Sequence, residues 1–139
     1  MSRKPRRILL KFGSGILTQP RANALDAKQF ARLTAEVAQL VRGGCKCIIV
    51  SSGAVAAGMR VVGLTERPHD LTTGQACAAV GQSKMMHLYA SMFAKHHLNV
   101  AQLLLTHSDL DSRTRYQNAK NTLERLLECK DVEIGRAHV

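Results

Sequence analysis

Tryptophan is absent from this sequence, and aromatic residues make up only 4 % of its 139 residues. A core would therefore be built from Ala, Val, Leu, Ile and Met rather than from rings. No apolar run approaches the roughly 18 residues that a membrane-spanning helix needs. The start, Met-Ser-Arg-Lys-Pro-Arg-Arg, is followed by no long apolar stretch of the kind found in signal peptides. These absences predict a soluble, unexported chain with no membrane partner.

Cysteine is too sparse for a disulfide framework. Cys45, Cys47, Cys77 and Cys129 lie in apolar, periodic segments, where free thiols act as small hydrophobic side chains. No second pair of Cys or His lies at zinc spacing from Cys45 and Cys47, so no metal ligands are predicted. This cysteine usage predicts the reducing cytoplasm as the compartment.

Acidic residues are also few, with 10 Asp+Glu against 20 Lys+Arg and a net charge of +10. A basic balance can indicate a nucleic-acid partner. However, Arg3, Lys4, Arg6 and Arg7 are bunched ahead of the first apolar run, and the other basic residues are scattered. A bunched basic terminus is typical of a solvated tail, so nucleic acid is not the expected partner.

Short apolar runs alternate along the chain with helical patterns. Strands are predicted over 7–12, 45–50 and 99–105, and the first of them is predicted to be central and buried. Helices are predicted from Asp26 to Gly43, over 54–62, over 75–96, and after an acidic cap at Asp109, with an exposed loop over 63–73. Small residues are expected to let the third of these helices pack closely, namely Ala76, Ala79 and Val80.

This alternation of strands and helices places the chain in the α/β class. Parallel strands joined by right-handed helical crossovers are what the order favours. The predicted architecture is a truncated three-layer αβα sandwich with a mainly parallel sheet of three strands. The length suits one domain.

The last residues depart from this pattern. Residues 133–139, Glu-Ile-Gly-Arg-Ala-His-Val, match an in-frame translation of a widely used sequencing adapter. We therefore expect residues 1–132 to be the native part and 133–139 to be a non-native tail, which carries no functional argument.

Two glycine-and-serine turns follow predicted strands, where ligands bind in open parallel sheets. The first turn places Lys11 beside the backbone amides of Gly13 and Ser14, a combination that suits a polyphosphate. The second turn places Ser52 and Gly53 at the start of a helix, where a carboxylate or phosphate is favoured. Each turn taken alone is also compatible with an ordinary solvated lysine or serine cap.

Four segments together resemble the amino acid kinase family, in order, over nearly all of residues 7–132. They are Leu10-Lys-Phe-Gly-Ser14, Ile48-Ile-Val-Ser-Ser-Gly-Ala-Val-Ala-Ala-Gly58, Ala78-Ala-Val-Gly-Gln82, and Leu103-Leu-Leu-Thr106 with Tyr116-Gln-Asn-Ala-Lys-Asn-Thr-Leu123. The second and third segments are typical of the branch of the family that phosphorylates L-glutamate. The acetylglutamate and uridylate types, a second possibility, lack the second pattern.

The resemblance implies transfer of the γ-phosphoryl group of ATP to the γ-carboxylate of L-glutamate, with Mg²⁺, as the first step of proline biosynthesis. It implies that Lys11 contacts the ATP phosphates and stabilises the transferring group, and that Gly13 and Ser14 face those phosphates. It implies that Ser52 and Gly53 hold glutamate, and that the full-length protein is a homo-oligomer.

This sequence departs from the family pattern at three places. Gly15 stands where the family usually has serine, and Gly74 stands where it commonly has lysine. The family's Asn-Glu-Asn-Asp segment and its nucleotide-binding half do not follow residue 132, so we expect no ATP turnover by this chain alone. The alternative from another class is a non-catalytic basic module that binds a phosphate-bearing ligand or RNA.

Overall fold

A computed structural model of the chain describes residues 6–19, 24–105, 107–129 and 131–137. Its main sheet is parallel and has the order β1 (Arg7–Phe12), β4 (Lys46–Ser51), β6 (Asp131–Ala137), β5 (Asn99–Leu105). A small antiparallel sheet pairs β2 (Thr18–Gln19) with β3 (Ala24–Leu25). The helices are α1 (Ser14–Leu17), α2 (Ala27–Arg42), α3 (Ala54–Val62), α4 (Leu71–Ala94), α5 (His107–Asp111) and α6 (Arg113–Leu127).

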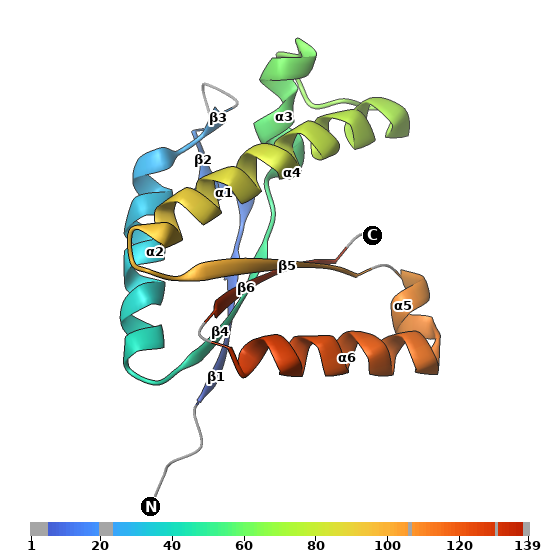
Figure 1. Cartoon of the computed structure of the whole chain (residues 1–139). Coiled ribbons are helices and arrows are strands. Elements are labelled where there is room, and N and C mark those ends of the chain that lie inside the picture. The colour runs from blue at the N-terminus through green and yellow to red at the C-terminus, as the bar shows by residue number, and fades with distance from the viewer. Residues whose placement is uncertain (1–5, 20–23, 106, 130, 138–139) are drawn as a thin grey trace, which may run out of the picture.

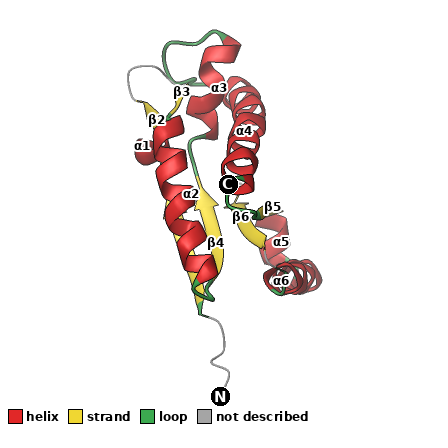
Figure 2. Cartoon of the chain, turned by 60° about the vertical axis from the view of Figure 1, so that its left-hand side comes forward, coloured by secondary structure: helices red, strands yellow, loops and turns green. Residues whose placement is uncertain are grey.

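Helices cover both faces of the main sheet. Figure 1 shows α4 and α6 on opposite sides of β5, and Figure 2 shows α2 alongside β4, across the sheet from α6. This arrangement confirms the predicted α/β class with helical layers around a parallel sheet.

The position of β1 differs from the prediction. Within the described sheet, β1 lies at an edge and pairs with β4, from Arg7 opposite Lys46 to Phe12 opposite Ser51. Leu9 on this strand is 66 % exposed. An apolar run indicates a strand but not which neighbours it pairs with, so the expectation of a central strand was wrong.

The strand β6 was not predicted. It lies between β4 and β5, with Val50 opposite Gly135 on one side and Leu103 opposite Gly135 on the other. The ladder of a parallel pair is made by backbone N–H and C=O groups and does not require an apolar sequence. The expected sheet of three strands is therefore corrected to one of four.

Two helix starts also differ from those expected. Helix α4 begins at Leu71 rather than at residue 75, because the Asp70 carboxylate accepts hydrogen bonds from the Thr73 N–H (2.9 Å) and hydroxyl (2.7 Å). The segment after β5 forms α5 and α6 instead of one helix, and Ser112 caps α6 by accepting from the Arg115 N–H at 3.4 Å.

The aromatic residues, although few, are concentrated in the core. Phe12, Phe30, Tyr89 and Phe93 are all buried between the sheet and the helices α2 and α4. The rings of Phe30 and Tyr89 lie 4.8 Å apart between centroids. The expectation of a core without rings was wrong, because a low overall count says nothing about where the rings are placed.

Helices α3 and α4 approach each other through glycines. A Cβ at Gly58 would overlap the carbonyl of Cys77, and a Cβ at Gly81 would overlap that of Ala54. The close packing expected for this helix is present, but Ala76 and Ala79 are exposed and do not provide it.

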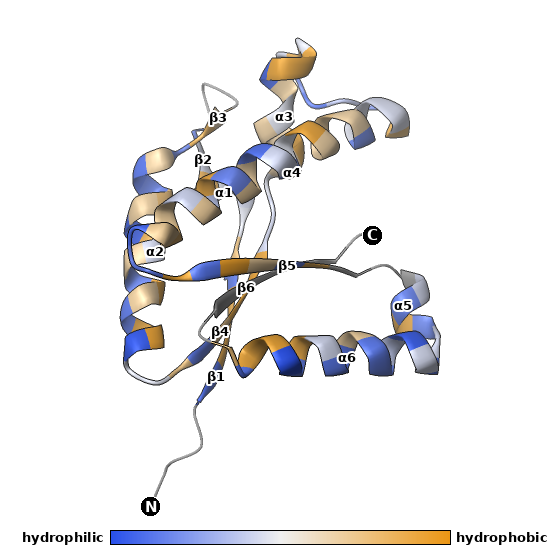
Figure 3. Cartoon of the chain, viewed as in Figure 1, coloured by the Kyte–Doolittle hydropathy of each residue, from blue (hydrophilic) through white to orange (hydrophobic). Residues whose placement is uncertain are grey.

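Polarity differs between the two helical layers. Figure 3 shows α6 as largely hydrophilic. Among the described residues of α6, only Leu127 is buried. The continuous core therefore lies on the side of α2 and α4.

Candidate functional site

The two turns singled out in the sequence lie side by side. Because β1 and β4 are parallel neighbours, the residues that follow them meet at the same edge of the sheet. The Ser52 N–H donates to the carbonyl oxygen of Phe12 at 3.0 Å, and the Ser52 hydroxyl donates to the same oxygen at 3.3 Å. Ser52 thus bridges the end of β4 to the end of β1.

Gly53 brings the turns closer still. Its φ is +97°, a left-handed conformation that glycine adopts without strain. A Cβ at this position would lie 3.6 Å from Ser14 and 3.5 Å from the methyl group of Thr18. The turn after β4 therefore leaves no more than the space of one methyl group between Gly53 and the turn after β1.

The second turn leads into α3 with no side-chain cap. Gly53 is the N-cap residue, and its carbonyl accepts from the Ala57 N–H at 2.9 Å. The first amides of a helix have no partner within it and carry the positive end of the helix dipole. An anionic group is therefore favoured beside Ser52 and Gly53.

The first turn is open. A Cβ at Gly13 or at Gly15 would meet no atom within 4 Å. The turn forms the short helix α1, which the sequence did not predict, and Ser14 is held through its carbonyl, which accepts from the Thr18 hydroxyl at 2.6 Å. The backbone is thus open at Gly13 and at Gly15, on either side of Ser14.

Lys11 belongs to the same end of β1. It is exposed and lies opposite Val50 in the register, and it alternates with Phe12, which is buried against the core. Its ammonium group is therefore available on the side of the sheet away from α2 and α4.

The end of β5 lies further along the sheet from these turns, because β6 separates β5 from β4.

A buried hydroxyl pair next to the turns was missed by the sequence reasoning. The Ser51 Oγ and the Tyr89 Oη lie 2.9 Å apart, and either can donate. Burial raises the pKa of Tyr89 to about 12, and the hydrogen bond with Ser51 opposes this rise. The residues are far apart in sequence, so no local pattern could have indicated the pair.

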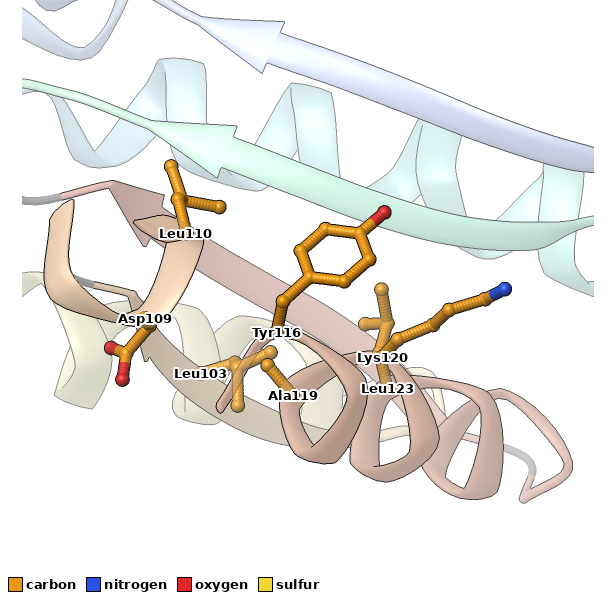
Figure 4. A pocket seen from close by; sticks show the side chains of 7 residues that line it. All are labelled: Leu103, Asp109, Leu110, Tyr116, Ala119, Lys120 and Leu123. Atoms are coloured by element: carbon orange, nitrogen blue, oxygen red, sulfur yellow. The ribbon is translucent and has the colours of Figure 1, made fainter. Parts of the chain in front are cut away.

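A cavity of about 150 Å³ lies elsewhere, between α5, α6 and the sheet. Figure 4 shows Leu110 from α5 and Tyr116 from α6 extending toward the strands, with Leu103 from β5 among the lining residues. None of the predicted site residues lines it.

Metal ligands are not gathered in the described part of the chain, where no three His, Cys, Asp or Glu side chains come together. Cys45, Cys47, Cys77 and Cys129 are free thiols. Burial is the main cause of a raised pKa at Cys47, with Cys45 a lesser cause.

Comparison with protein families decides where the chain belongs. The model described as "Amino acid kinase family" matches residues 6–134. The chain belongs to the amino acid kinase family. The family resemblance of the quoted segments is thereby confirmed.

Curated relatives of this amino acid kinase chain share nearly half of its residues. It is 47 % identical over 127 residues to the glutamate 5-kinase of Citrifermentans bemidjiense, covering 91 % of this chain and 34 % of the relative. It is 49 % identical over 129 residues to that of Thermus thermophilus, covering 93 % and 34 %. The chain therefore spans about a third of the length of these relatives.

A solved structure shares the fold of this amino acid kinase chain. The UMP kinase of Bacillus anthracis aligns with a TM-score of 0.54 at 16 % identity, covering 96 % of this chain and 53 % of that one.

Among the helices in the described residues, none combines the length and apolarity needed to cross a bilayer.

Proposed function

We propose that this chain is part of a glutamate 5-kinase, which transfers the γ-phosphoryl group of ATP to the γ-carboxylate of L-glutamate in the first step of proline biosynthesis. The observation that carries the proposal is the contact between the Lys11–Ser14 and Ser52–Gly53 turns. The identity of 44–49 % to glutamate 5-kinases supports it. We also propose that residues 1–132 are the native part of the kinase domain and that residues 133–139 are a non-native tail.

In the proposed reaction, the Ser52–Gly53 turn binds glutamate and the Lys11–Ser14 turn binds the ATP phosphates. A γ-carboxylate oxygen of glutamate attacks the γ-phosphorus of ATP, the bond from that phosphorus to the β,γ-bridging oxygen breaks, and ADP leaves. Such transfers depend mostly on positioning and charge neutralisation. The adjacent turns would hold the two reactants at neighbouring points of one sheet edge.

Each residue has a proposed role. The Lys11 ammonium offsets the charge that spreads over the transferring phosphoryl group. The amides of Gly13 and Ser14 face the ATP phosphates. The turn of Ser52 and Gly53 holds a carboxylate of glutamate by placing it at the free amides that open α3.

Mg²⁺ is also part of the proposal, although the described residues do not form a site for it. It would enter with ATP, and no step depends on it. A cytoplasmic location and a homo-oligomeric full-length protein complete the proposal, the former supported by four free cysteines.

The decisive experiment measures ADP release with ATP and glutamate. A protein of the relatives' length that carries residues 1–132 of this sequence should turn over, whereas the 139-residue chain should not. In the longer protein, Lys11→Met should lower kcat by about 10²-fold or more. Lys28→Met, on the exposed surface of α2, is the matched control and should leave kcat unchanged.

Two results would contradict the proposal: turnover by the 139-residue chain at the rate of the longer protein, or no glutamate-dependent ADP release by the longer protein. Retention on RNA that weakens steeply with salt would instead favour the non-catalytic basic module.

A further inference from the structure

The Ser51 and Tyr89 hydroxyls form a buried polar contact next to the candidate glutamate turn, since Ser51 directly precedes Ser52. Tyr89 is 1 % exposed and Ser51 is 4 % exposed. A buried hydroxyl is costly unless it is hydrogen-bonded. Two such groups facing each other at 2.9 Å thus fix each other's orientation.

The Tyr89 ring cannot easily move to another position. It lies against Phe30 of α2, with centroids 4.8 Å apart at 59°, and stacks on Phe93 of α4 at 6.3 Å and 15°. Tyr89 belongs to α4 itself, so one contact to α2 and one within its own helix hold the ring and present its hydroxyl to Ser51.

Ser51 links the Tyr89 hydroxyl to the turn after β4. It is the last residue of β4, directly before Ser52, whose N–H and hydroxyl both donate to Phe12. Gly53, with its left-handed backbone, follows at once. A displacement of Ser51 would therefore move the two residues proposed to hold glutamate.

We propose that Tyr89 is a positioning residue for the candidate glutamate site, which it orders by holding Ser51 at the end of β4. Tyr89 does not touch the substrate. The proposal rests on the proposed function for its link to glutamate, whereas the ordering of the turn by Tyr89 stands on the geometry alone.

The burial of Tyr89 supports this role. Burial raises the pKa of Tyr89 to about 12. The phenol would be protonated at neutral pH even at its ordinary value of 10.0, so its hydroxyl can donate to Ser51 or accept from it. Phenylalanine would preserve the ring contacts and remove only this hydrogen bond, which makes Tyr89→Phe a clean test.

The first measurement is amide hydrogen exchange at Ser52, whose N–H donates to Phe12, in the longer protein without substrate. We expect Tyr89→Phe to increase exchange at this amide about fivefold, the factor for one net hydrogen bond. Tyr116→Phe is the matched control, since Tyr116 is the other tyrosine of the chain and lies on α6. Unchanged exchange in Tyr89→Phe would overturn the proposal whatever the activity.

The second measurement is steady-state kinetics of Tyr89→Phe and of the double variant Ser51→Ala with Tyr89→Phe. We expect the KM for glutamate to rise about fivefold in both, with the KM for ATP unchanged. The double variant leaves neither hydroxyl of the pair without a partner. It should therefore regain most of the unfolding free energy that Tyr89→Phe loses. A merely structural role would return its KM to the wild-type value, and that result would overturn the proposal.

The two proposals can fail separately. If the wild-type longer protein shows no glutamate-dependent turnover while exchange still rises in Tyr89→Phe, the ordering of the turn is supported and its assignment to glutamate is overturned.

Discussion

At the residue scale, glycine decides how closely α3 and α4 pack. A Cβ at Gly81 would overlap the backbone of Ala54, which belongs to a neighbouring helix and cannot rotate away. We expect Gly81→Ala to lower the free energy of unfolding by about 1–3 kcal/mol, measured by urea denaturation, in spite of the higher helix propensity of alanine.

Gly74 provides the control in the same helix. A Cβ there would meet only Pro68, at an ordinary contact distance of 3.9 Å. Gly74→Ala should therefore be neutral or stabilising by up to about 1 kcal/mol. Equal destabilisation by the two variants would show that the close approach at Gly81 is not what limits the packing.

The Tyr89 hydroxyl gives a pH-dependent signature. Its folded pKa of about 12 lies above its ordinary value of 10.0, so the unfolded state loses the proton first as the pH rises. The contribution to stability is complete below pH 10 and is lost between pH 10 and 12. Over this range the unfolding free energy of the wild type should fall by roughly 2–3 kcal/mol more than that of Tyr89→Phe. Parallel curves for the two proteins would contradict this.

At the element scale, α2 depends on its amino-terminal cap. The Asp26 carboxylate accepts from the Lys28 N–H at 3.2 Å and from the Gln29 N–H at 3.3 Å. Asp26→Ala should therefore cost about 1 kcal/mol of unfolding free energy, measured by urea denaturation, whereas Asp26→Ser should keep most of it. A serine variant as unstable as the alanine variant would show that the cap is not the cause.

At the scale of the whole molecule, one strand joins the two halves of the sheet. β6 pairs with β4 and with β5 at Gly135, so β5 and β4 are connected only through it in the described sheet. Gly135 lies in the proposed non-native tail, so the variant is made in the 139-residue chain. There Gly135→Pro removes the N–H from this interior ladder. We expect faster amide exchange along β5 while β1 and β4 keep their protection. Gly135→Ala, which keeps the N–H, is the control, and unchanged protection of β5 in the proline variant would contradict the pairing.

The sequence by itself determined the class of the fold and much of its local structure. The bounds predicted for β1, α3 and β5 agree with those observed, because apolar periodicity and glycine turns act over a few neighbouring residues. The two candidate turns were recognised for the same reason, since Gly13, Ser14, Ser52 and Gly53 follow strands directly.

Only the tertiary structure decided how these elements meet. The edge position of β1, the insertion of β6 and the hydrogen bond from Ser52 to Phe12 depend on which strands pair. The Ser51 and Tyr89 hydroxyls meet across 38 residues of chain. Local patterns indicate that a segment is buried, but they do not indicate which other segment it packs against. That choice is set by packing between distant parts of the chain.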